Sequence, residues 1–321
     1  MGAYVFRRLI QAFFTVLGVM VLTFLLFNLI AGDVSANYVN PKQGKQAKEL
    51  WREKHGLNKP LFLNPEAGGA VWKEEFYNTQ FWHHMKGCVT FSAHSYRYED
   101  QTLLQIIAAK AKYSLALTVP AMAVGWLLAL VISSAVAYFR GTWLDRSGVF
   151  LTVLGMCIPY LAYMILGQWV MFQISPEHAW GLADSMNIYV PVTIAVVASL
   201  GFSVRFYRTI LLDEMNRDYV RTARAKGVPL PTVLFKHVLK NCMLPILTSL
   251  VLSIPFLIMG SLLLEQFFGV NGLGDLMLSS INDRDVPIIT GLTFLTAVIY
   301  VIGLLITDVL YAVFDPRIRL S

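Results

Sequence analysis

Long stretches without a charged side chain alternate with short polar segments along the chain. Six of these stretches lack Asp, Glu, Lys and Arg and reach the roughly 20 residues that a helix needs to cross a bilayer. Lipid cannot satisfy backbone polar groups, so a stretch of this kind is predicted to be helical. The sequence therefore predicts an all-α integral membrane protein with six transmembrane helices, at residues 9–32, 113–139, 147–176, 185–204, 241–264 and 286–307.

The composition favours a membrane protein over a soluble one. Charged residues make up only 14% of the chain, whereas a soluble protein needs about 25%. This disfavours the alternative in which the stretches are core helices of a large soluble enzyme. The first stretch follows Arg7 and Arg8, as in a secretory signal, but it exceeds the roughly 7–15 apolar residues of a signal-peptide core. We expect a retained anchor whose two arginines form a cytoplasmic flank and not a twin-arginine signal.

Basic residues in the short connections predict the orientation. With six crossings, all of these connections lie on one side, which the positive-inside rule makes cytoplasmic, together with both termini. The net charge of +6 thus reflects topology, and with no basic stripe interleaved with aromatic residues we expect no nucleic-acid partner. The basic residues of this side are Arg7, Arg8, Arg140, Arg146, Arg205, Arg208, Arg217, Arg221, Arg224, Lys226, Lys236, Lys240, Arg317 and Arg319.

The long polar segment 33–102 is predicted to lie outside and to fold. Its basic and acidic residues nearly balance, and the sequence "WKEEFYNTQFWHHMKG" (72–87) is too rich in aromatic residues for a disordered linker. We therefore expect three parts: an N-terminal anchor with the first helix (1–32), an external insertion (33–102), and a transmembrane core (103–321) with a cytoplasmic loop at 205–240.

Candidate chemistry is sparse. The histidines His83, His84 and His94 suggest a metal site, but adjacent histidines rarely reach one ion and no carboxylate lies at ligand spacing, so we expect an ordinary loop and no metal. Cys88, Cys157 and Cys242 fall in or beside different predicted segments, and no disulfide is expected. No phosphate-binding loop, zinc-protease motif or nucleophile elbow is present, so neither catalysis nor ATP hydrolysis is predicted for this chain.

Two acidic residues lie at the ends of charge-free stretches. Glu265 follows the fifth stretch and Asp308 follows the sixth. Ionisable residues at membrane depth are candidates for a transport pathway. A structural role at the membrane interface is the alternative, and it is favoured because both residues lie at the ends of stretches.

The sequence "RTARAKGVPLP" (221–231) predicts a short basic helix on the cytoplasmic side. Asp218 can start this helix, Gly227 can end it in a left-handed conformation, and Pro229 prevents its continuation, while Pro231 suits the first turn of the next helix. Asp213 and Glu214 mark the end of the preceding membrane helix, and Arg217, Arg221 and Arg224 are expected on one face. The spacing leaves two roles open: docking on a protein partner, or binding anionic lipid headgroups.

A resemblance favours the first role. The sequence "RDYVRTARAKGVPLPTVLFKHVLKN" (217–241) resembles the cytoplasmic EAA loop of ABC-importer permeases, in the peptide-importer branch. Arg221, Thr222 and Ala223 take the places of Glu-Ala-Ala, and Gly227 takes that of the glycine. The acidic start and a later proline are missing, as in the peptide branch. The resemblance implies that the ATPase-coupling residues are Asp218, Tyr219, Arg221, Thr222, Ala223, Arg224, Ala225, Lys226 and Gly227.

Four further segments resemble the B-type first permease subunit of dipeptide, oligopeptide and nickel importers. They are 6–34, "HGLNKPL" (55–61), 267–289 with Asn271 where a proline is common, and "DVLYAVFDPRIRL" (308–320). Only the region around 64–100 matches poorly.

The resemblance implies a type I permease in the bacterial inner membrane. Its expected partners are a homologous second permease, two ATPases that bind ATP and Mg²⁺, an external substrate-binding protein and membrane lipids. The chain itself would bind no cofactor. A dipeptide, an oligopeptide, a peptide antibiotic, a nickel complex and a sugar all stay open as substrates. The alternatives are a secondary transporter or channel without ATPases, for which we find no midplane charges, and an integral-membrane enzyme, for which we find no polar catalytic cluster.

Overall fold

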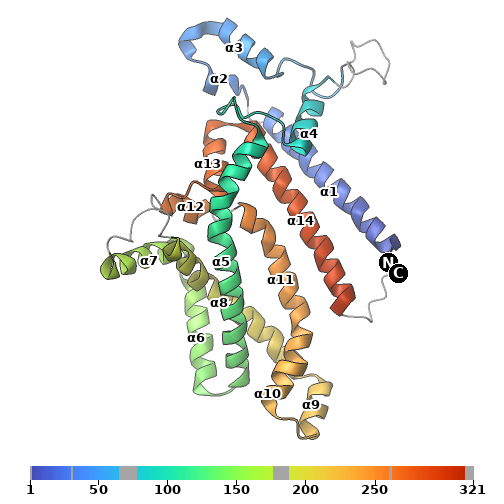
Figure 1. Cartoon of the computed structure of the whole chain (residues 1–321), viewed down its shortest axis with the longest axis vertical. Coiled ribbons are helices and arrows are strands. Elements are labelled where there is room, and N and C mark those ends of the chain that lie inside the picture. The colour runs from blue at the N-terminus through green and yellow to red at the C-terminus, as the bar shows by residue number, and fades with distance from the viewer. Residues whose placement is uncertain (1, 30–31, 65–77, 176–187, 260–261, 315–321) are drawn as a thin grey trace. The chain divides into compact units, whose positions relative to one another are not determined.

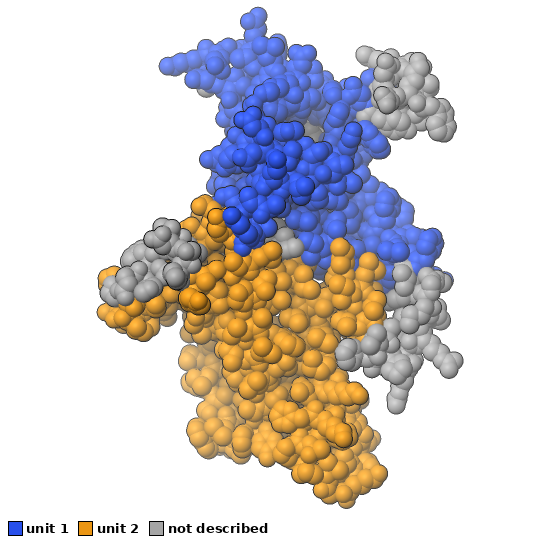
Figure 2. Space-filling model, viewed as in Figure 1, with its two compact units in different colours: residues 1–112, 273–301 blue, residues 113–272, 302–321 orange. Residues whose placement is uncertain are grey.

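The computed structural model describes residues 2–29, 32–64, 78–175, 188–259 and 262–314, and these residues are largely helical (Figure 1). Within these ranges the β pairing is limited to an isolated bridge between His94 and Thr102. The chain divides into two compact units, which Figure 2 colours separately. The predicted all-α class is confirmed. The division into anchor, insertion and core stays a prediction, because packing alone does not locate the membrane.

The first unit comprises residues 1–112 and 273–301. Aromatic side chains hold its polar part together: Tyr38 stacks on Trp51 with ring centroids 5.3 Å apart, and Phe24 packs edge-on against Phe81. The described part of the aromatic-rich segment 72–87 begins at 78 and is mostly helical. Its elements are α1 (Gly2–Leu29), α2 (Ser35–Tyr38), the 3-10 turn η1 (Pro41–Gln43), α3 (Gly44–Lys54), α4 (Gln80–Thr90), the start of α5 (Leu103–Tyr138), α13 (Leu273–Asp283) and the start of α14 (Val286–Phe314).

The second unit comprises residues 113–272 and 302–321. Helices α6 and α8 approach each other closely in this unit, where a Cβ atom on Gly201 would lie 3.1 Å from the backbone oxygen of Thr152. Only glycine lets the two backbones approach so closely. Its elements are the rest of α5, α6 (Trp143–Cys157), α7 (Tyr160–Ile174), α8 (Tyr189–Met215), α9 (Asp218–Ala225), α10 (Leu230–Thr232), the π-helical turn η4 (Val233–Val238), α11 (Leu239–Met259), α12 (Leu262–Phe268) and the end of α14.

Five helical segments of the described chain are long and apolar enough to cross a membrane. A sixth crossing exists only if α6 and α7 together form one span, and these two helices meet at an angle of 102°. The prediction of one continuous helix over 147–176 is therefore wrong. The break falls at Ile158 and Pro159, both extended, because a proline removes a helical hydrogen bond and disfavours the helical region for the residue before it. The five segments are Phe6–Phe27, Leu103–Tyr138, Tyr189–Met215, Leu230–Leu257 and Val286–Tyr311.

The segment 205–240, which was predicted to be a cytoplasmic loop, is mostly helical. Helix α8 continues past the charge-free stretch to Met215 because Val204, Tyr207 and Leu211 bury one face of it. Asp213 and Glu214 lie in its last turn, as predicted. Helix resumes at Leu230, so the connection between the two spans is short and contains α9.

Candidate functional site

Helix α9 packs one face on the core of its unit. Val220 is only 2% exposed, and Tyr219 and Ala223 pack beside it against the cluster that includes Val233 and Leu234. The Tyr219 hydroxyl donates a hydrogen bond to Glu214 Oε1 at 3.0 Å. Burial raises the pKa of Tyr219 to about 12, so the hydroxyl keeps its proton at neutral pH. These contacts fix α9 to the end of α8 and to η4.

The end of α9 is a Schellman motif, as the glycine predicted. Gly227 has a φ of +79°, its N–H bonds to the Arg224 carbonyl at 3.0 Å, and the Val228 N–H bonds to the Ala223 carbonyl at 3.2 Å. This pair of hydrogen bonds requires a left-handed backbone at the residue just past the end of the helix, which is Gly227 here. No atom lies within 4 Å of a Cβ placed on Gly227. The glycine is therefore required for its backbone conformation and not for space.

The opposite face of α9 is cationic and exposed. Arg221, Arg224 and Lys226 are all exposed. Arg217 is also exposed, but it is the N-cap with an extended ψ of 151°, so the prediction that it shares the helix face is only partly right. The nearest carboxylate to Arg221 is Asp218, at 3.6 Å, and both side chains are largely in solvent, where such a pair contributes little. Four cationic groups are thus presented to solvent on one short segment.

The three other predicted coupling residues complete this surface. Asp218 begins α9, Thr222 is exposed on it, and Ala225 is exposed at its end. Ala223, in contrast, faces the core, so its small size allows α9 to approach its own unit.

A buried ion pair joins α6 to α8, and the sequence did not predict it. Asp145 in the first turn of α6 is 7% exposed. Its Oδ1 accepts bonds from Arg208 Nε at 3.0 Å and Nη2 at 2.6 Å, and its Oδ2 accepts from the Gly141 N–H at 2.9 Å. The sequence did contain a signal for this pair, because a carboxylate lies just before one predicted span and an arginine lies just after the end of another.

Glu265 is fully buried in α12. Its Oε1 accepts a hydrogen bond from Ser114 Oγ at 2.6 Å. A Cβ on Gly272 would lie 2.5 Å from Glu265 Oε2, so a larger residue there would displace this carboxylate. This geometry favours the structural role over the pathway role. Asp308 lies half-buried near the end of α14.

The three histidines have different neighbours. His83 Nε2 lies 2.8 Å from Lys59 Nζ, His84 packs on the Phe24 ring, and His94 pairs with Thr102. Among the described residues no three His, Cys, Asp or Glu side chains are grouped so as to hold a metal ion. The expectation of no metal stays a prediction.

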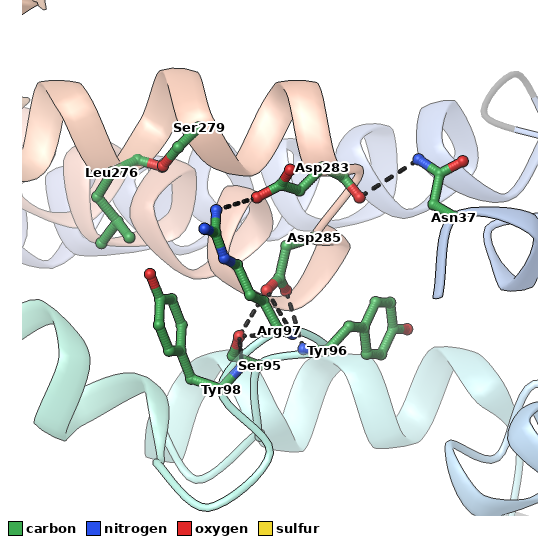
Figure 3. A network of polar contacts seen from close by, with 9 residues as sticks. All are labelled: Asn37, Ser95, Tyr96, Arg97, Tyr98, Leu276, Ser279, Asp283 and Asp285. Atoms are coloured by element: carbon green, nitrogen blue, oxygen red, sulfur yellow. Dashed lines mark hydrogen bonds and ion pairs between the residues drawn. The ribbon is translucent and has the colours of Figure 1, made fainter. Parts of the chain in front are cut away.

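The first unit contains a network of polar contacts around Asp285 (Figure 3). Asp285 is 1% exposed and accepts bonds from Ser95 Oγ at 2.5 Å and from the N–H groups of Tyr96 and Arg97 at 3.2 Å each. The Arg97 guanidinium pairs with Asp283 instead. Asp285 thus fixes the segment before α5 to the junction of α13 and α14. Sequence reasoning missed it, although an aspartate directly before a predicted span was a usable signal.

The described helices define a polytopic helical membrane protein with a short basic helix between two of its spans. The family described as "Binding-protein-dependent transport system inner membrane component" matches residues 116–320. The chain therefore belongs to this family and is a multi-pass inner-membrane protein.

Curated relatives match over nearly the whole chain. The glutathione transport system permease protein GsiC of Salmonella typhimurium is 33% identical, covering 98% of both chains. The oligopeptide transport system permease protein AppB of Bacillus subtilis is 31% identical, covering 99% of this chain and all of the relative. GsiC of Escherichia coli O6:H1 is 31% identical, with 98% of both chains covered. The resemblance to peptide-importer permeases is confirmed.

Proposed function

We propose that the chain is a permease subunit of an ATP-driven importer for short peptides. It would form part of the translocation pathway with a second permease and would bind the ATPases through α9. Membership of the binding-protein-dependent family and the names of the relatives support this proposal. They disfavour a secondary transporter, a channel or an enzyme. ATP and Mg²⁺ would bind only to the separate ATPase subunits.

The single observation that carries the coupling role is the two-faced construction of α9. Its apolar face is fixed to α8 and η4, while its cationic face is free for a partner. A displacement of α9 is therefore transmitted to both flanking spans through short connections. ATPase dimers can shift the permease between states only through contacts that differ between those states. The arginines offer forked, charge-assisted hydrogen bonds for such contacts.

We expect Gly227→Val to lower uptake and transport-stimulated ATP hydrolysis together, while its abundance in the membrane stays near normal. The β-branched residue resists the φ of +79°, which costs about 1–3 kcal/mol locally and disturbs the end of α9. The measurement is retention of the ATPases on purification of the permease, together with uptake in vesicles.

Two variants control for this test. Gly227→Asn tolerates the left-handed region better and should retain most activity. Gly44→Val imposes strain at a φ of +76° in the first unit, outside α9, and should leave ATPase retention intact. The lipid alternative predicts instead that Arg221→Gln with Arg224→Gln changes the dependence on anionic lipid and nothing else. Full ATPase retention and full coupling in Gly227→Val and in this arginine variant would refute the docking role.

We also propose that both termini are cytoplasmic and that 33–102 lies outside. Native Cys88 cannot report this, because it is 3% exposed and burial raises the pKa of its thiol to about 11. In a Cys157→Ser background, an impermeant maleimide should label Lys45→Cys in intact spheroplasts. It should label Arg224→Cys only after the membrane is opened. The reverse pattern would overturn the orientation.

A further inference from the structure

The first unit contains a cavity of about 680 Å³. It lies among the ends of α1, α3 and α4 and the starts of α5 and α14, and its apolar part includes Phe24, Phe27 and Leu103. A volume of this order suits a small ligand, since such sites typically measure about 300–1,000 Å³. Nothing in the coupling role of α9 uses this cavity.

Cationic side chains gather at this cavity, although the segment as a whole is nearly neutral. Within the described part of 33–102 there are eight basic and five acidic residues. Four of the basic residues line the cavity, but only one of the acidic residues, Asp33, does so. The four are Arg52, Lys54, Lys59 and Lys86.

Two of these cations are the strongest candidates for binding a ligand. Lys54 already forms an ion pair with Glu99, and Arg52 lies near enough to Asp33 to lower the pKa of that carboxyl, after the larger effect of the Ser35 hydroxyl. Lys59 and Lys86 both lie near His83. Burial, followed by these two lysines, lowers the pKa of His83.

His83 and His84 add hydrogen-bonding atoms to the cavity. Burial lowers the pKa of His84 to about 4, so it is neutral at pH 7. His83 Nε2 lies 2.8 Å from Lys59 Nζ and 2.9 Å from Asn78 Oδ1, and the nearby Lys59 cation disfavours a second positive charge on this imidazole. The cavity therefore combines cationic side chains, imidazoles and an aromatic wall.

We propose that this cavity binds short peptides that carry more carboxylates than amines, and so selects acidic peptides among the importer's substrates. Lys59 and Lys86 bind carboxylates, and the aromatic wall contacts the peptide's apolar atoms. The inference rests on the proposed import of peptides and assigns a substrate class to it. Charge-assisted bonds to carboxylates are about twice as strong as neutral ones, so the cavity would favour such peptides over neutral ones.

The test uses the assembled importer in neutral-lipid nanodiscs without its binding protein. Labelled triglutamate is the probe and labelled trialanine is its neutral counterpart. We expect Lys59→Gln with Lys86→Gln to weaken triglutamate binding by about tenfold or more and to remove most of its salt dependence. Lys42→Gln with Lys45→Gln removes the same charge from exposed sites outside the cavity and should leave binding unchanged.

Uptake separates this inference from the proposed function. With the binding protein present, the cavity variant should keep trialanine uptake and lose triglutamate uptake. Wild-type importer that takes up neither peptide, yet binds triglutamate through Lys59 and Lys86, would contradict the proposed function and leave the cavity assignment standing.

Several results would overturn the cavity assignment. One is equal loss in both lysine variants, which indicates a general charge effect. A second is an equal loss of trialanine uptake, which indicates a role of the lysines in folding or in docking of another protein. A third is displacement of triglutamate by phosphatidylglycerol, which indicates a lipid site.

Discussion

Replacing Asp285 by Ala is expected to lower the free energy of unfolding of the first unit by about 3–5 kcal/mol. The side chain is almost fully buried and accepts three hydrogen bonds, from one hydroxyl and two backbone N–H groups. A hydrogen bond to a charged group contributes about 1.5–3 kcal/mol, and the substitution removes the acceptor from the buried Ser95 hydroxyl and from the Tyr96 N–H. Contributions within one network are not additive, which keeps the total below the simple sum.

A nearby aspartate provides the matched control. Asp283 pairs with Arg97, but both side chains are substantially exposed, and exposed ion pairs contribute about 1 kcal/mol or less. Thermal unfolding and limited proteolysis of the purified protein should therefore show a large shift for Asp285→Ala and a small one for Asp283→Ala. Equal shifts would mean that the charge near this junction matters and the buried network does not.

The backbone next to Asp285 is strained, and the hydrogen bonds of the Asp285 carboxylate offset this strain. Arg284, directly before it, has a φ of +57°, a conformation that costs a residue other than glycine about 1–2 kcal/mol. The Asp285 N–H closes the end of α13 by bonding to the Ser280 carbonyl at 2.8 Å. The junction therefore combines an unfavourable backbone with a fully satisfied carboxylate, and loss of the carboxylate leaves the strain uncompensated.

The membrane spans were predictable because charge exclusion is a property of each stretch by itself. Whether each span forms one unbroken helix was less predictable. Pro159 breaks a span, yet Pro120 lies within the continuous helix α5 and Pro245 within α11. Neighbouring helices and local adjustments can satisfy the backbone groups that a proline frees. Which outcome follows depends on packing, and a single sequence does not show packing.

The ends of α9 were predictable for a similar reason. A left-handed glycine followed by a proline ends a helix through local geometry alone, and Gly227 and Pro229 do so here. Asp285 and its partner Ser95, in contrast, are separated by 190 positions in the chain. No local rule pairs such residues, so this buried network had to come from the structure.

Replacing Asp145 by Ala is the second change with a large expected effect. It leaves the partly buried Arg208 guanidinium without its carboxylate and the Gly141 N–H without its acceptor. Removal of one partner of a buried pair typically costs about 3–5 kcal/mol. Because α8 leads directly into α9, the loosened contact between α6 and α8 should also weaken the transmission of movement from α9 to the spans.

A double-mutant cycle isolates the pair from the general damage of each substitution. Asp145→Ala and Arg208→Ala should each destabilise strongly, but the double variant should be less damaging than their sum, with a coupling energy of about 1.5–3 kcal/mol. The exposed pair of Asp218 and Arg221 serves as the comparison cycle and should show no measurable coupling. Unfolding in a graded detergent series gives the energies, and the ratio of peptide imported to ATP consumed gives the functional effect. If the effects of the two substitutions in the first cycle are strictly additive, the ion pair does not hold α6 to α8. If they couple in stability while the transport ratio of Asp145→Ala stays at the wild-type value, the pair maintains the fold without taking part in the transmission of movement.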